Sequence, residues 1–118
     1  MATATTGQFQ PRLCNDITVT IANNATESSA ADLSGTAFIG MVLLAEFDGT
    51  SMTFKVSTDG TTYQPMRNLA GTLATATVAA SNSYGIVPSD FAAWRFIKLV
   101  AGTAQTGATI ITLQTLPL

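Results

Sequence analysis

The amino-acid sequence predicts an all-β protein, an antiparallel β-sandwich of the jelly-roll type preceded by an extended N-terminal arm. Two observations support this prediction. Apolar and polar residues alternate within short segments, and turns rich in Gly, Asn and Asp separate these segments at regular spacing. We therefore expect an arm over residues 1–15 and a single domain over residues 16–118, which is large enough for one modest hydrophobic core.

The first fifteen residues have no hydrophobic period, and they carry Phe9, Leu13 and Cys14 as apolar or sulfur-bearing anchors. Such a segment buries too little apolar surface to fold alone. It becomes ordered only where contacts with a partner offset the conformational entropy that it loses. We predict that the arm fastens the protein to a partner through Phe9 and Leu13, with Arg12 pairing with a partner's carboxylate. A loose tail, or a first edge strand of the domain's own sheet, is the alternative.

Clean alternation predicts half-buried strands over residues 16–21 and 51–57. Between them, residues 38–47 are mostly apolar on both faces, which is typical of a central strand covered on each side. A buried helix is the alternative for this segment, and Gly40 and Val42 disfavour it.

After residue 58, the Asp59-Gly60 pair predicts a tight hairpin turn. The remaining sequence predicts further short strands, the last of which closes the domain. These strands are expected over residues 63–66, 72–80, 84–87, 95–100 and 109–116.

One helical turn is predicted over residues 88–90, with Ser89 as its cap, carrying Phe91 and Trp94 towards the core. The inward residues of the alternating strands are expected in or near that core. They are Ile17, Val19, Ile21, Phe54, Val56, Ile97 and Leu99.

Charged residues make up only 10% of the chain, against roughly 25% in a typical soluble domain. A neutral exterior costs little to desolvate, so we expect packing against another protein or self-association, with a soluble monomer as the alternative. Five Lys and Arg residues and a net charge of -2 argue against nucleic-acid binding. The longest apolar run, residues 38–45, is too short to span a bilayer, and residues 1–10 lack a signal-peptide pattern, so no membrane association is expected.

The sequence contains no His, which removes the commonest general base and most zinc sites, and leaves Cys14 without an activating base. Glu46 and Asp48 could form a carboxylate pair for glycoside hydrolysis, but carboxylates at a strand end are more often turn and solubility residues. We therefore expect no enzymatic activity, no cofactor, and no catalytic or metal site. A calcium ion held by loop carbonyls with Asp48 or Asp59 stays an open alternative.

Three aromatic side chains could stack on a sugar or a base: Tyr63, Tyr84 and Trp94. Trp94 lies between Phe91 and Phe96 in an apolar neighbourhood, which favours a place in the core. Tyr63, just past a predicted hairpin tip, is the candidate exposed aromatic.

Two segments resemble known families. FKVSTDGTTY at residues 54–63 resembles the strand and turn of discoidin-like, galactose-binding-type jelly rolls, and PSDFAAWRFIKL at residues 88–99 resembles a later strand of the same group. In this order, the pair is also similar to small virion proteins of tailed phages, and the resemblance covers roughly residues 50–116. The single Cys and the few charges depart from discoidin-type domains that bind sugars or lipids, so the resemblance implies the fold more than ligand binding.

The resemblance to phage virion proteins implies a structural protein that decorates or cements a capsid by binding the major capsid protein lattice. It implies a location on the capsid surface after synthesis in the host cytoplasm. It also implies a homotrimer, because decoration proteins of this kind often sit on three-fold positions. The alternative function is a glycan- or receptor-binding module of a phage tail or a bacterial surface.

Overall fold

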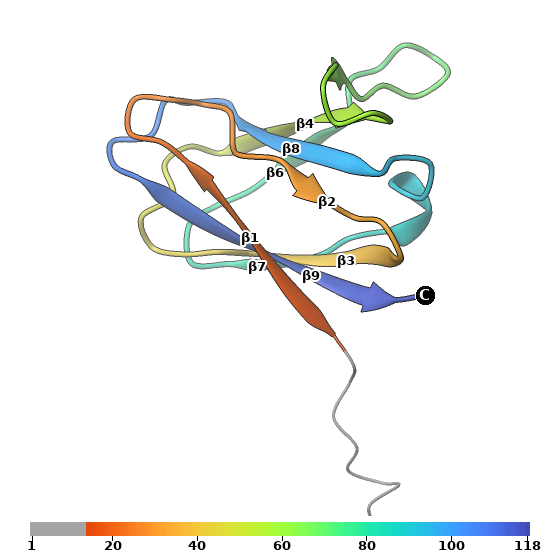
Figure 1. Cartoon of the computed structure of the whole chain (residues 1–118). Coiled ribbons are helices and arrows are strands. Elements are labelled where there is room, and N and C mark those ends of the chain that lie inside the picture. The colour runs from red at the N-terminus through yellow and green to blue at the C-terminus, as the bar shows by residue number, and fades with distance from the viewer. Residues whose placement is uncertain (1–13) are drawn as a thin grey trace, which may run out of the picture.

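The computed structural model describes residues 14–118, and these form two antiparallel β-sheets packed face to face (Figure 1). The predicted all-β sandwich is confirmed. The predicted arm, with Phe9, Arg12 and Leu13, lies outside the described residues except at its end, where the first strand already begins at Asn15.

Each sheet combines strands from both halves of the chain. Sheet A, the lower layer in Figure 1, contains β1 (Asn15–Ile21), β9 (Thr109–Pro117), β3 (Thr36–Leu43) and β7 (Ser83–Gly85), paired in that order. Sheet B, the upper layer, contains β2 (Ala31–Asp32), β8 (Phe96–Ala101), β4 (Ser51–Ser57) and β5 (Gln64–Pro65) in order, and β6 (Thr75–Thr77) also pairs with β4. Apart from β4, β5 and β6, successive strands alternate between the sheets, which is the connection of a jelly roll.

The core lies between the sheets and contains the residues that alternation predicted. Six of the seven predicted core residues are buried, and Ile17 is half-buried against them. Alternation identifies them because a strand with one covered face turns every second side chain inwards.

Strand β3 departs from the prediction of a strand covered on both sides. It ends at Leu43, and its pairing with β9 shifts between Phe38 and Gly40, which marks a β-bulge. The bulge lets Phe38, Met41 and Leu43 all face the core, although the first two are three positions apart. The apolar sequence of this segment therefore combines a shifted inner face with an outer face on which Val42 is half-buried, and no other strand or helix of residues 14–118 covers that outer face.

The predicted helical turn forms as a 3₁₀ turn, η2 (Pro88–Asp90), but Ser89 does not cap it. The N-cap position is Val87, which has no side-chain cap hydrogen bond, because the turn begins at Pro88 and so places Ser89 inside it. Phe91 holds the segment instead, with its buried ring 5.0 Å from that of Phe38 and 5.1 Å from that of Phe54, measured between centroids.

Candidate functional site

The outer face of sheet A is almost free of charge. Its outward side chains alternate with buried ones along all four strands. We call the following residues the sheet A face: Asp16, Thr18, Thr20, Ala37, Gly40, Val42, Ser83, Gly85, Ile110, Thr112, Gln114 and Leu116. Asp16 alone among them is ionisable, and its carboxylate accepts a hydrogen bond from the side-chain amide of Gln114.

One row of residues crosses the middle of the sheet A face. Thr18 lies opposite Thr112, which lies opposite Val42, and Val42 in turn lies opposite Ser83. The row presents methyl and hydroxyl groups with no ionised group. Such a surface loses little hydration free energy when another protein covers it.

The outer face of sheet B, in contrast, carries two lysines. Lys55 on β4 lies opposite Lys98 on β8, and the Glu27 carboxylate accepts hydrogen bonds from both, at 3.2 Å from Lys98 Nζ. The bond from Lys55 is the main cause that lowers the pKa of Glu27. Lys98 Nζ also lies 4.4 Å from the ring centroid of the half-buried Tyr63, so one face of the predicted exposed aromatic is covered by an ammonium group.

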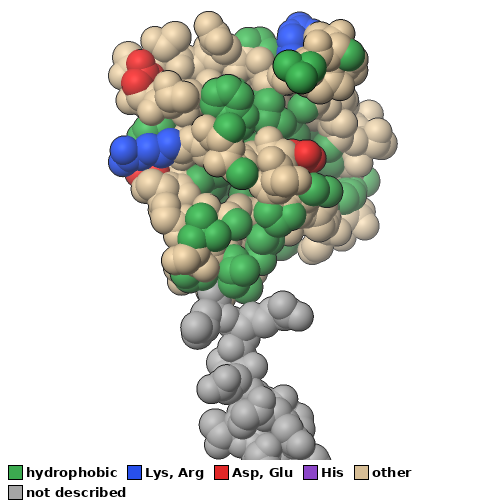
Figure 2. All heavy atoms as spheres, turned by 90° about the vertical axis from the view of Figure 1, so that its right-hand side faces the viewer, with side chains coloured by type: hydrophobic (Ala, Val, Ile, Leu, Met, Phe, Trp, Pro, Cys, Tyr) green, Lys and Arg blue, Asp and Glu red, His purple; other side chains and the backbone are tan. Residues whose placement is uncertain are grey.

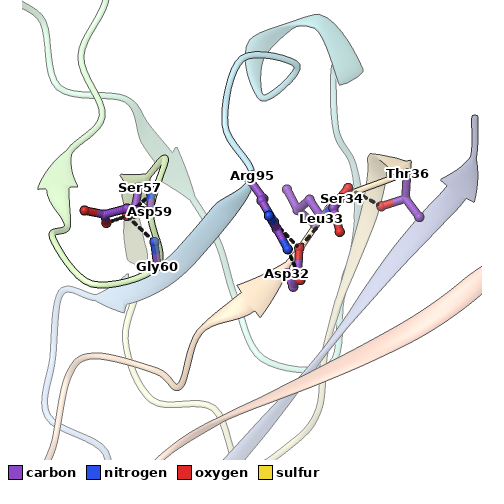
Figure 3. A network of polar contacts seen from close by, with 8 residues as sticks. All are labelled: Asp32, Leu33, Ser34, Thr36, Ser57, Asp59, Gly60 and Arg95. Atoms are coloured by element: carbon purple, nitrogen blue, oxygen red, sulfur yellow. Dashed lines mark hydrogen bonds and ion pairs between the residues drawn. The ribbon is translucent and has the colours of Figure 1, made fainter.

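A second ion pair stands at the margin of sheet B. Arg95 Nε lies 3.4 Å from Asp32 Oδ1 (Figure 3). The guanidinium carbon also lies 4.8 Å from the centroid of the Phe96 ring. The pKa of Asp32 is lowered chiefly by the hydrogen bond from the Ser34 backbone N–H, with a further contribution from Arg95. The charges of sheet B are therefore paired with one another.

Asp59 organises the turn after β4. Its Oδ1 accepts hydrogen bonds from the backbone N–H groups of Thr61 (2.8 Å) and Thr62 (2.9 Å) and from Ser57 Oγ (2.9 Å), and Ser57 Oγ accepts from Gly60 N–H (Figure 3). Gly60 has φ +79°, which a residue with a side chain rarely adopts. The chain turns at Asp59-Gly60 as predicted, but six residues connect β4 to β5, so the connection is longer than a tight hairpin turn. The N–H groups of Thr62 and Thr61 lower the pKa of Asp59 to about 2.

The two acidic residues considered for a calcium site, Asp48 and Asp59, are not brought together. The carboxylate of Asp48 accepts hydrogen bonds from the Thr106 backbone (2.9 Å) and hydroxyl (2.8 Å), which lower its pKa. Asp48 precedes β4 and Asp59 follows it, so the two carboxylates lie at opposite ends of one strand. Within residues 14–118, no group of three acidic or Cys side chains could hold a metal ion, and no helix is long and apolar enough to cross a membrane.

We expect Asp59 to make stability depend on pH. Its pKa lies below the ordinary 3.8, so its contribution is complete above that pH and is lost as the pH falls towards about 2. Asp59→Asn keeps an acceptor oxygen for the turn but cannot titrate, so this variant should lose less stability over that interval than the wild type. Urea midpoints measured across the interval test this, with Asp90→Asn as control; equal pH dependence in all three proteins would contradict it.

The most hollowed surface surrounds residues 88–95, at one end of the sandwich. Figure 2 looks onto this end and shows hydrophobic side chains gathered over it, with charged side chains at its margin. Two hollows of about 370 Å³ each share Met66, Arg67 and Trp94 in their walls, and we call them together the Trp94 groove. A third, of about 230 Å³, lies between Phe91 and Leu118.

Trp94 was predicted to be a core residue, and the structure places it at the boundary. It is half-buried and packs against the core, yet it also lines both hollows of the groove. Tyr84 is half-buried too, and its hydroxyl accepts a hydrogen bond from the Ala79 N–H at 2.8 Å. One feature of the sequence could have indicated this boundary position. Trp94 lies in a segment without the alternation of a strand, between η2 and β8.

The chain matches no protein-family model, no curated protein and no solved structure in comparisons with each of these three sets.

Proposed function

We propose that this protein is a structural virion component that decorates or cements a tailed-phage capsid. Its sheet A face would bind the major capsid protein lattice on the capsid surface, after synthesis in the host cytoplasm. The observation that carries the proposal is the lack of charge on that face, where Asp16 is the one ionisable residue. The resemblance of residues 50–116 to small phage virion proteins supports the choice of partner.

The distribution of charge favours sheet A over sheet B as the docking surface. Covering sheet B would remove Lys55, Lys98 and Glu27 from water, and desolvating an ion pair costs about as much as the pairing returns. Covering sheet A removes mainly methyl, methylene and hydroxyl groups, with Ile110 44% and Leu116 40% exposed in the uncovered protein.

Self-association into a homotrimer is part of the proposal. The open edge of β1 presents the backbone groups of Asp16 and Thr18. Farther along the strand, the backbone groups of Thr20 are already hydrogen-bonded to Ser29. Exposed edges of this kind pair readily with another chain. The proposed fastening role of Phe9, Arg12 and Leu13 concerns residues outside the described range and stays a prediction.

A lysine in the middle of the sheet A face should abolish capsid binding. Thr112→Lys places an ammonium group in the row that we propose to be covered, so affinity should fall about tenfold or more. The matched control is Thr53→Lys, on the outer face of sheet B, because Thr53 is also a half-buried threonine within a paired strand. Co-sedimentation with capsids assembled from a major capsid protein encoded in the same genome measures both.

The proposal expects wild type and Thr53→Lys to sediment with capsids and Thr112→Lys to stay in solution. Wild-type protein that never sediments with these capsids contradicts the function, and equal binding by the two variants contradicts the face. Sedimentation equilibrium of the free and capsid-released protein tests the trimer separately.

A further inference from the structure

We propose that the Trp94 groove is a binding site for a neutral oligosaccharide. The inference goes beyond the proposed capsid function, because none of the residues that line the groove belongs to the sheet A face. A copy attached through sheet A would still leave the groove open to solvent.

The groove has the size and form of a small-ligand site. Its two hollows of about 370 Å³ lie on either side of one wall formed by Met66, Arg67 and Trp94. Ligand sites commonly measure about 300–1,000 Å³ and combine an apolar floor with a few placed polar groups. Two adjacent hollows of this volume with a shared wall suit a chain of sugar rings better than one ring.

Trp94 supplies the aromatic floor. One side of its side chain packs against the core, which fixes its position, and the remainder lines the hollows. Its indole N–H finds no acceptor among residues 14–118, and no fully buried side-chain nitrogen in that range lacks a partner, so this N–H is at least partly exposed. An aromatic ring with a free polar edge suits a sugar, which has an apolar C–H face and a rim of hydroxyl groups.

The side chains around Trp94 offer both donors and acceptors. Asp59 uses Oδ1 in its turn, which holds the carboxylate rigidly and leaves Oδ2 available. Arg67 donates through Nη1 to the Gly71 carbonyl at 2.9 Å and keeps its other N–H groups. The exposed Gln64 amide and the Thr62 hydroxyl complete the set lining the first hollow. Sugar hydroxyls donate and accept at once, so a mixed set of this kind satisfies them.

The charges of the groove disfavour an anionic ligand. Asp59 in the first hollow and Asp90 in the second outnumber Arg67, the only basic residue lining either of them. An anionic sugar or a nucleotide would meet two carboxylates and one guanidinium. A purely apolar ligand would leave Asp59 and Arg67 covered without partners, which is costly.

The single Trp of the chain lets fluorescence report binding directly. Full-length protein is tested on an array of neutral, acidic and amino-sugar glycans, and maltotriose, cellotriose and chitotriose are titrated against Trp emission. We expect binding to neutral glycans and a saturable change in emission with at least one trisaccharide. Calorimetry should show about tenfold weaker binding for Gln64→Ala and for Trp94→Phe, while Gln114→Ala on the sheet A face binds unchanged.

A blank array, a preference for acidic glycans, or binding that Gln64→Ala leaves unchanged overturns the inference. Gln64 is exposed, so its substitution should not affect folding. The test therefore does not depend on whether the protein still folds when Trp94 is replaced. Capsid co-sedimentation uses the sheet A variants, so failure of either proposal can be recognised independently of the other.

Discussion

Replacing Phe91 by alanine is expected to lower the free energy of unfolding by about 3 kcal/mol. The ring is buried and makes edge contacts with Phe38 on β3 and Phe54 on β4, so it joins the two sheets at this end of the sandwich. Buried Phe to Ala changes commonly cost about 3–5 kcal/mol. We expect the lower end of that range, because hollows beside Phe91 admit water into part of the space that the ring leaves.

Guanidinium denaturation measures this loss, and Val87→Ala is its matched control. Val87 lies in the same segment but is 59% exposed, so its substitution should change stability by less than about 0.5 kcal/mol. A loss below about 1 kcal/mol for Phe91→Ala would show that the segment is not held by its aromatic contacts. The Trp94 backbone N–H donates to the Phe91 backbone carbonyl at 3.1 Å, so any shift of this segment in Phe91→Ala should also move Trp94 and disturb the Trp94 groove.

The strands with one covered face could be predicted from the sequence. β1, β4 and β9 form over or close to the expected residues, because burial of one face leaves an alternating pattern in the chain. The turn at Asp59 was predictable for a related reason, since its conformation depends on the side chain of Asp59 and the freedom of Gly60.

β3 could not be predicted in the same way. Its outer face carries Val42 as well as Gly40, so apolar residues occur on both faces of the strand. The pattern therefore does not indicate which residues point towards the core. The bulge after Phe38 then changes which residues point inwards, and a bulge depends on the partner strand β9, which lies far along the sequence.

The sequence indicated a neutral exterior but not its asymmetry. Lys55 and Lys98 share one face only because β4 pairs with β8, a contact between segments about forty residues apart. Arg95 falls within the strand predicted over residues 95–100, yet it precedes β8 and pairs with Asp32, so the strand period does not apply to it. Strand order, which the sequence pattern does not contain, therefore decides where the charged and uncharged faces lie.

Gln105 forms a hydrogen-bond network whose loss should be costly. It is 1% exposed, and its Nε2 donates to the carbonyl oxygens of Asp48 (2.8 Å) and Thr103 (3.0 Å). Its Oε1 accepts from the Asp48 backbone N–H (2.9 Å) and from the Thr109 hydroxyl (3.0 Å). One amide thus satisfies the loop that leads from β3 to β4 and the loop that leads from β8 to β9.

Gln105→Leu is therefore expected to lower the free energy of unfolding by about 3 kcal/mol. Leucine has a similar size but leaves the N–H and carbonyl groups of Asp48 without partners, at about 1–3 kcal/mol for each buried group. The Thr109 hydroxyl keeps its hydrogen bond to the Gly107 carbonyl at 3.1 Å, so Thr109 should contribute little to the loss of stability. Gln114→Leu is the matched control, because its amide makes one side-chain hydrogen bond on the sheet A face, and it should cost less than about 1 kcal/mol. Guanidinium denaturation of both variants tests the prediction, and equal losses would show that burial of the Gln105 network adds nothing to its stabilising effect.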